Sequence, residues 1–376
     1  MIITASNIKL NFYSGEKADL YIRFAGGTSD ELVRLVKDNK VFENVYVIQA
    51  PRIKCGRNLI KFNIKYKRQY DRIFTNIGAC KTYTDVFVAG FWNDSLYYIN
   101  EFFQYNNKIR IHLYDEGGIT YELKKGDLCK YVVGVGKISW KVRIKQAFPL
   151  LLWQYKYKKN VEDKIYVYVP EWYKNVDSKL ECIQIPTIQK NKEMLQIMCG
   201  INSSDAFLLS IYNRCKIIYI GRGASLAIPD ADKQDESIIL SMVAMGLGKK
   251  VVVKTHPNVT SNRCLFGKEL EKKVNIDRGK YTAESIFNNI DIDNKILVMY
   301  GSSTAMFTKK MLDKEPYIVF VFRMFHQYDE QGDIAAEKYA KKIIGLYKDK
   351  NKIAIPNNMY EFERILQEQY YKTLNY

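Results

Sequence analysis

The sequence lacks the cysteine patterns of disulfide frameworks and of zinc sites. Its 7 cysteines are scattered over 376 residues without a C-x-x-C pair, and an odd number in a long chain is typical of free thiols in a reducing compartment. No stretch approaches the roughly 20 apolar residues that span a bilayer, and the first residues carry no charged segment followed by a long apolar one. We therefore expect a cytoplasmic protein.

Common nucleotide and metal signatures are missing as well. There is no P-loop with its lysine, and the G-R-G-A segment at 221–224 lacks the third glycine of a dinucleotide fingerprint. The two D-x-D segments, 230–232 and 291–293, fall in a turn and a polar loop, where carboxylates are usually solvated. We therefore expect neither a bound metal nor a cofactor.

Positive charge is what the chain has in excess. The 58 Lys and Arg outnumber the 41 Asp and Glu, which gives a net charge of +17 and suits nucleic acid, membrane head groups or a phosphorylated substrate. A nucleic-acid-binding protein is the non-enzymatic alternative, but the basic residues are spread out and no RNP, zinc-finger or helix-turn-helix signature occurs. The basic and aromatic segment 137–159 suits an interdomain linker or a peripheral contact with an anionic membrane at its inner face.

Short β-branched runs alternate with helix-like segments from end to end, which predicts an α/β protein with parallel sheets. The expected strands are 19–24, 45–49, 72–75, 85–89, 109–113, 131–135, 165–169, 217–220, 250–253, 296–300 and 317–322, and the expected helices are 29–37, 95–104, 235–245, 305–312 and 357–369. The pattern divides into two Rossmann-like domains, 1–160 and 161–355. A C-terminal helix in 356–376 is expected to pack back on the first domain.

The first candidate site follows the expected strand at 109–113, where Asp115, Glu116, Gly117 and Gly118 stand in succession. Adjacent carboxylates disfavour joint ionisation, which raises one pKa, and the glycines let the backbone turn sharply beside a substrate. A carboxylate in this place is a candidate general base. The alternative is a tight turn with solvated acids.

The second candidate follows the strand at 250–253 and contains Lys254, His256 and Pro257. Proline restricts the preceding histidine to extended conformations, which holds the imidazole at the strand end. Beside the lysine it can receive an anionic leaving group as an acid or a hydrogen-bond donor. A buried structural histidine is the alternative.

The third candidate is Gly301, Ser302, Ser303 and Thr304, after the strand at 296–300 and before a helix. Free backbone amides, the helix dipole and hydroxyl donors converge at such a helix start, which makes it a seat for a phosphate. Simple N-capping by serine or threonine is the alternative.

In this order, the D-E-G, H-P and S-S motifs resemble the three signatures of bacterial sialyltransferases with a GT-B fold, notably glycosyltransferase family 52 and the related polysialyltransferases. Residues 281–286 (YTAESI) are similar to the P-x-E segment of that family, with Thr282 in place of proline and Glu284 retained. The resemblance covers roughly residues 109–312. Proteins of that family often begin with an apolar strand, whereas residues 1–13 of this chain form a short segment of mixed polarity. We therefore expect a few residues to be missing there.

The resemblance implies that Asp115 is the general base and that His256 faces the phosphate of the CMP leaving group. Ser302 and Ser303 would bind that phosphate. Glu284 would bind the ribose hydroxyls, and Lys254 would lie on the cytosine side. The expected donor-binding residues are Lys254, Pro257, Glu284, Gly301, Ser302, Ser303 and Thr304, and the expected acceptor-side residues are Glu116, Gly117, Gly118, Asn93 and Asp94.

These inferences together predict an inverting, metal-independent sialyltransferase. It would transfer N-acetylneuraminic acid from its CMP derivative to a cell-surface glycan such as lipooligosaccharide or capsule. The alternatives are a GT-B transferase for another CMP-activated acid such as Kdo, or for a nucleotide diphosphate sugar, because the same phosphate seat serves all of them. The expected partners are the nucleotide sugar and the glycan acceptor, with a homodimer as a candidate assembly.

Overall fold

Continuous apolar runs form the strands at the centre of this fold. In the computed structural model, β7 (Ile217–Ile220), β8 (Val251–Lys254) and β10 (Ile296–Met299) are buried along their whole length. Strands buried on both faces are typical of parallel sheets that are covered by helices. All strand pairs among the described residues are parallel, so the expected α/β class with parallel sheets is confirmed.

The chain divides into two compact units. Unit 1 comprises Met1–Phe24 and Lys40–Pro186, and unit 2 comprises Ala25–Asn39 and Thr187–Tyr376. The structure describes residues 2–24, 30–49, 68–69, 71–75, 82–89, 93–115, 117–121, 158–191, 194, 205–222, 231–255, 266–278, 281–325 and 330–374.

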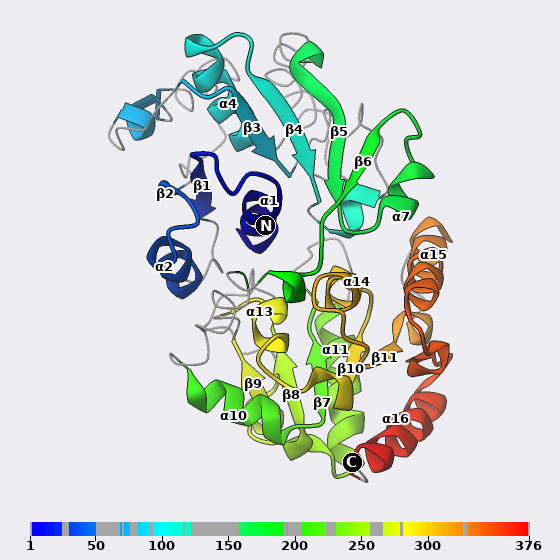
Figure 1. The fold of residues 1–376 in the computed structure, drawn as a ribbon. Coiled ribbons are helices and arrows are strands. Elements are labelled where there is room, and N and C mark those ends of the chain that lie inside the picture. Colours follow the sequence, from blue (N-terminus) through cyan, green and yellow to red (C-terminus); the bar gives the residue numbers. More distant parts are fainter. Residues whose placement is uncertain are drawn as a thin grey trace, which may run out of the picture. The chain divides into compact units, whose positions relative to one another are not determined.

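Unit 1 contains a four-stranded parallel sheet in the order β3-β4-β5-β6 and a separate parallel pair, β1-β2 (Figure 1). Its strands are β1 (Asp19–Phe24), β2 (Asn44–Gln49), β3 (Asp85–Val88), β4 (Arg110–Tyr114), β5 (Val161–Val167) and β6 (Glu181–Gln184), and its helices are α1 (Ile2–Phe12), α4 (Asn93–Tyr105), η1 (Gly118–Tyr121), η2 (Lys158–Asn160) and α7 (Pro170–Lys174). An apolar cluster of Ile48, Phe74, Phe102 and Ile109 joins the β1-β2 pair to α4 and to the start of β4.

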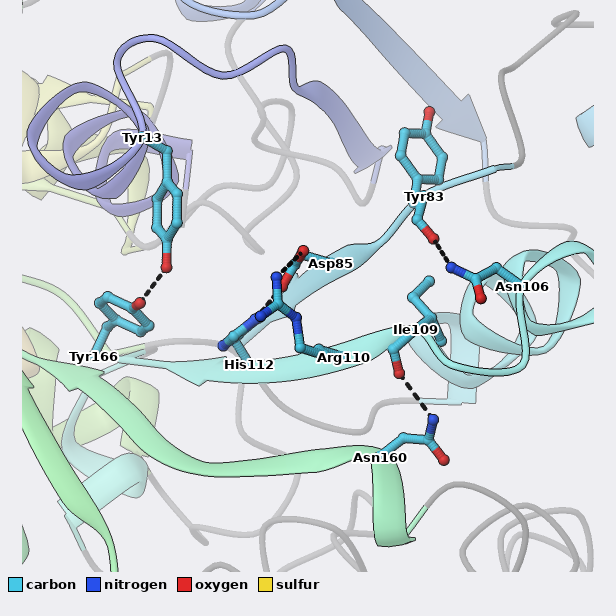
Figure 2. A network of polar contacts seen from close by, with 9 residues as sticks. All are labelled: Tyr13, Tyr83, Asp85, Asn106, Ile109, Arg110, His112, Asn160 and Tyr166. Atoms are coloured by element: carbon cyan, nitrogen blue, oxygen red, sulfur yellow. Dashed lines mark hydrogen bonds and ion pairs between the residues drawn. The ribbon is translucent and has the colours of Figure 1, made fainter.

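Polar contacts fix the amino-terminal ends of the unit 1 strands (Figure 2). Asp85 of β3 accepts a hydrogen bond from Arg110 at 2.7 Å and contacts His112 Nε2 at 2.7 Å, both on the neighbouring β4. Asn160 donates to the carbonyl of Ile109 at 2.9 Å. These bonds connect β3 to β4 and the residue before β5 to the residue before β4. Because the strands pair in parallel, their carboxyl ends lie along one edge of the sheet.

Unit 2 is built on a six-stranded parallel sheet in the order β12-β11-β10-β7-β8-β9. Counted along unit 2, this is the 3-2-1-4-5-6 order of Rossmann folds. Its remaining strands are β9 (Asn275–Asp277), β11 (Tyr317–Phe320) and β12 (Ile353–Ala354), and its helices are α2 (Asp30–Asp38), η3 (Ile188–Lys190), α10 (Ala206–Arg214), α11 (Ala231–Ala244), η4 (Gly248–Lys250), α12 (Lys268–Glu271), α13 (Ala283–Phe287), η5 (Ile292–Asn294), α14 (Ser303–Lys310), η6 (Phe322–Met324), α15 (Glu330–Leu346), η7 (Lys350–Lys352) and α16 (Met359–Leu374).

The C-terminal helix α16 belongs to unit 2. It buries Phe362, Leu366 and Tyr370 along one face, and Glu363 accepts a hydrogen bond of 2.7 Å from Ser241 of α11. Its expected packing on the first domain stays a prediction. No helix within the described ranges is long and apolar enough to cross a membrane.

Most of the expected elements are present with ends no more than four residues from the predicted ones, but residues 71–75 are helical rather than a strand. A short apolar run does not distinguish a strand from a buried helix, and Phe74 packs edge-on against Tyr98 and Phe102 of α4. The expected strand 131–135 and most of the segment 137–159 lie outside the described residues. The boundary of the two units falls after Pro186 rather than after residue 160, because β5 pairs with β4 and β6 pairs with β5.

Candidate functional site

The strand order of unit 2 reverses at one defined position. The chain proceeds outward from β7 to β8 and β9 on one side and, after returning, from β10 to β11 and β12 on the other. In open parallel sheets, ligands bind beyond the carboxyl ends of the two strands at which the order reverses, because their loops diverge there. These strands are β7, followed by Gly221 and Arg222, and β10, followed by Tyr300 to Thr304.

Ser302 is the N-cap residue of α14. Its extended backbone begins the helix, and its Oγ accepts a hydrogen bond from the backbone N–H of Thr304 at 3.2 Å. Tyr339 of α15 donates to the carbonyl of Ser302 at 2.7 Å and holds the cap in place. Gly301 is exposed and Ser303 is half-buried. The N-cap, which was the alternative to a phosphate seat, is thus present, and the phosphate seat stays a prediction.

Arg222 lies two residues after the end of β7 and was not singled out by its sequence pattern. Its Nε donates to Asp235 of α11 at 2.7 Å, and a second guanidinium nitrogen donates to Gln234 at 3.0 Å. Tyr219 donates to the same Asp235 oxygen at 2.7 Å. The guanidinium carbon lies 4.8 Å from the ring centre of Tyr300, which precedes the serine motif. This cluster therefore connects the end of β7 to the end of β10.

Charge and burial compete at Asp235. Desolvation raises the pKa of its carboxyl above the ordinary value, while Arg222 and the hydroxyl of Tyr219 limit the rise. The side chains of Arg222 and Asp235 are only 10% and 13% exposed. A pair that is shielded from solvent to this degree keeps its geometry, because breaking it leaves a poorly solvated charge.

Lys254 ends β8 as an interior residue. Its ammonium lies 3.1 Å from a carboxylate oxygen of Asp277 on β9, and the two side chains are 3% and 2% exposed. Tyr212 of α10 donates to that same oxygen at 2.7 Å. The long-range pairing favours a structural role for Lys254 over the predicted contact with the cytosine.

Glu284 lies in the first turn of α13 and is partly exposed. Thr282, in the position expected for proline, is the N-cap of that helix and accepts a hydrogen bond from the backbone of Ser285 at 3.3 Å. Helix α13 packs against α14, which carries the serine motif at its start. The fold therefore brings the segment with Glu284 to the same helix layer as the expected phosphate seat.

Asp115 follows β4 in unit 1 and is completely buried. One of its oxygens accepts a hydrogen bond from the backbone N–H of Gly117 at 2.7 Å. The other accepts from the hydroxyl of Tyr121 and, at 3.4 Å, from the backbone N–H of Tyr168. The Tyr121 hydroxyl in turn accepts from the backbone of Val169 at 3.1 Å. The aspartate therefore closes its own turn and joins it to the loop after β5, which excludes solvation for this acid.

Burial controls the protonation of this pair. Desolvation raises the pKa of Asp115 to about 6, although the bonds from Tyr121, Gly117 and Tyr168 act in the opposite direction. The pKa of Tyr121 rises well above its usual range, through burial and the neighbouring carboxylate. Tyr121 therefore stays a neutral donor, and Asp115 is a stronger base than an exposed aspartate while remaining ionised above about pH 6.

The remaining predicted residues are placed only in part. Gly117 has a φ of +131°, a conformation that favours glycine, and Gly118 begins η1. Asn93 and Asp94 begin α4, but their side chains lie outside the described part of the chain. Glu116, His256 and Pro257 also lie outside the described residues.

Comparison with known proteins gives no family assignment, since neither a scan of protein-family models nor a search of curated proteins yields a match. Among the described residues, no group of three or more histidine, cysteine, aspartate or glutamate side chains is arranged to hold a metal ion.

Proposed function

We propose that this chain is an inverting, metal-independent sialyltransferase with a GT-B arrangement of two Rossmann-like domains. It transfers N-acetylneuraminic acid from CMP-N-acetylneuraminic acid to a hydroxyl of a cell-surface glycan such as lipooligosaccharide or capsule. The observation that carries the proposal is the position of Ser302 and Ser303. These residues follow β10, one of the two strands at which the 3-2-1-4-5-6 order of unit 2 reverses.

The donor half of the reaction requires stabilisation of a leaving phosphate. As the bond between C2 of the sugar and the phosphate oxygen breaks, negative charge develops on CMP and positive charge on the sugar ring. The amino end of α14, with Ser302 and Ser303, supplies hydrogen-bond donors and a helix dipole for the phosphate. His256 supplies a further donor, and Glu284 accepts from the ribose hydroxyls.

The acceptor half requires a base. An acceptor hydroxyl attacks C2 from the face opposite CMP, so that the configuration inverts, and its proton passes to the base. Asp115 suits this role because its pKa of about 6 leaves it ionised at neutral pH yet more basic than an ordinary aspartate. Its oxygens are enclosed by Gly117, Tyr121 and Tyr168. Binding of the acceptor must therefore open the turn that encloses it.

Substitution of Asp115 tests the catalytic assignment. We expect Asp115→Asn to lower the rate of transfer by about 10²- to 10⁴-fold, the range for loss of a general base, with CMP affinity unchanged. The exposed residue Glu181 of the same sheet provides the control Glu181→Gln, which should keep full activity. His256→Ala should impair both transfer and CMP binding. Retention of most activity by Asp115→Asn would remove it as the base.

A further inference from the structure

The end of β8 holds a buried hydroxyl without a partner. Thr255 directly follows β8 and is 4% exposed. Its Oγ1 has no hydrogen-bond partner in the part of the chain that the structure describes. An unsatisfied hydroxyl in a protein interior costs roughly 1–3 kcal/mol, so such a group in a native protein calls for a physical explanation.

The backbone around this hydroxyl is firmly held. The N–H of Thr255 donates to the carbonyl of Asp277 at 2.9 Å, and the N–H of Gly221 donates to the carbonyl of Lys254 at 2.9 Å. Thr255 is therefore fixed between the ends of β7 and β9. The ion pair of Lys254 with Asp277 adds a buried polar contact at the preceding residue. Because the backbone on both sides is bonded, the hydroxyl cannot gain a partner by a small backbone adjustment.

Its location is next to the reversal of strand order. Gly221 follows β7, and a side-chain carbon at this glycine would lie 3.3 Å from the carbonyl oxygen of Lys254 and 3.8 Å from Cα of Thr255. Glycine thus allows the close approach of the ends of β7 and β8 beside the reversal of strand order. Thr255 is therefore next to the strand end beyond which ligands bind in sheets of this order.

We propose that Thr255 is a donor-binding residue whose hydroxyl forms a hydrogen bond with a ribose or phosphate oxygen of the bound nucleotide. The inference rests on the proposed function for the nucleotide class of the ligand. It adds a contact from β8 to those expected from the serine motif after β10. The ligand supplies the partner that the free protein lacks, so the hydroxyl costs stability in the free state and contributes affinity in the bound state.

The test uses the full chain with Thr255→Val, which keeps the shape and removes the hydroxyl, and Thr255→Ser, which keeps the hydroxyl. Titration calorimetry with CMP should give roughly tenfold weaker binding for Thr255→Val, in line with the loss of one hydrogen bond, and near-normal binding for Thr255→Ser. Cytidine distinguishes the two oxygen sources. A loss of affinity for CMP alone assigns the hydroxyl to the phosphate, and an equal loss for cytidine assigns it to the ribose.

Thermal unfolding of the free proteins separates a binding role from a structural one. If the hydroxyl awaits a ligand, Thr255→Val should unfold about 2–4 °C above the parent chain. A lower unfolding temperature, or unchanged CMP affinity of Thr255→Val, would overturn the inference. Failure of the parent chain to bind CMP would remove the nucleotide class and the proposed function. A higher unfolding temperature of Thr255→Val would then show only that the hydroxyl lacks a partner in the free chain.

Discussion

Asp115 closes a turn and is also an unusually weak acid for an aspartate. Its carboxylate closes the turn through Gly117 and connects it to Tyr121, while burial raises its pKa to about 6. The alternative of a solvated turn acid requires exposure, and this side chain has none. Burial makes Asp115 a stronger base. For the same reason, the charged form of this side chain lowers the free energy of unfolding by a measurable amount.

We expect the stability of the chain to depend on the protonation of Asp115. Because its folded-state pKa of about 6 lies above the ordinary value of 3.8, the folded chain holds a proton that the unfolded chain loses between these pH values. The free energy of unfolding therefore falls as pH rises from about 4 to about 6, by about 3 kcal/mol for this one group. Asp115→Asn carries no such proton. In urea unfolding, the stability of this variant relative to the parent chain should therefore rise by that amount between pH 4 and pH 7. Parallel pH profiles would contradict the buried, raised pKa.

The buried pair of Lys254 and Asp277 provides a second prediction at this scale. Lys254→Met leaves the Asp277 charge without its cation in a nearly solvent-free place, so we expect a loss of about 3–5 kcal/mol in stability. Lys272 pairs with Glu269 at an exposed site, with side chains 71% and 81% exposed, and Lys272→Met should change stability by less than about 1 kcal/mol. Chemical denaturation of both variants measures the difference. Similar small losses for both would show that Lys254 is solvated and available to a ligand.

The sequence predicted the strand ends that carry the candidate residues, but it did not predict the contacts that these residues make. The end of β4 and the start of α14 were recognised because apolar strands precede them. The partner of Lys254 was not foreseen, because Asp277 and Tyr212 are distant in sequence and meet it only through strand pairing and helix packing. Arg222 gave no signal in its G-R-G-A segment, since its importance comes from the adjacency of β7 and β10.

At the scale of elements, the start of α14 has two separable functions. Ser302 caps the helix through its side chain, whereas Ser303 is the first helical residue. We expect Ser302→Ala to lower stability by about 1 kcal/mol and to weaken CMP binding. Ser303→Ala should weaken CMP binding with little loss of stability. Calorimetry and thermal unfolding of the two variants check this, and unchanged CMP affinity in both would leave the motif as a cap only.

The turn before β8 depends on a close approach of two backbones. A side-chain carbon at Gly248 in η4 would lie 2.6 Å from the carbonyl oxygen of Lys273, a contact that backbone atoms cannot easily relieve. Gly248→Ala should therefore destabilise the chain by roughly 1–3 kcal/mol. Gly345 in α15 has no atom within 4 Å of that position, and Gly345→Ala should be neutral or stabilising, because alanine favours helices. Equal unfolding midpoints for the two variants would contradict this packing.

Elements with long apolar runs or clear amphipathic spacing were predicted from sequence, including β7, β10, β11 and α11. The short strands β6, β9 and β12 were missed, because they have two to four residues and mixed composition. Helix α1 (Ile2–Phe12) was missed as well. It buries polar as well as apolar residues, Asn7 and Lys9 among them, so its sequence shows no helical stripe of apolar residues.

At the scale of the whole molecule, the two units each contain a parallel α/β sheet and each carry a chemically distinct strand end. Unit 1 carries Asp115, a carboxylate with a raised pKa, after β4. Unit 2 carries the serine motif, Ser302 and Ser303, at the reversal of its strand order. The expected domain boundary, after residue 160, lies earlier in the sequence than the observed division of the chain. The difference arises because β5 was assigned to the second domain from its position along the chain. Its pairing with β4 was not apparent from local composition.

The most direct test of the proposed sialyltransferase is the release of CMP from CMP-N-acetylneuraminic acid by the purified chain in EDTA. It is measured with and without galactose-terminated and sialylated acceptors, and the CMP derivative of Kdo serves as the competing donor. The account predicts acceptor-stimulated release from the sialic acid donor that EDTA does not reduce. No release from that donor, together with no thermal stabilisation of the chain by CMP, would contradict the assignment.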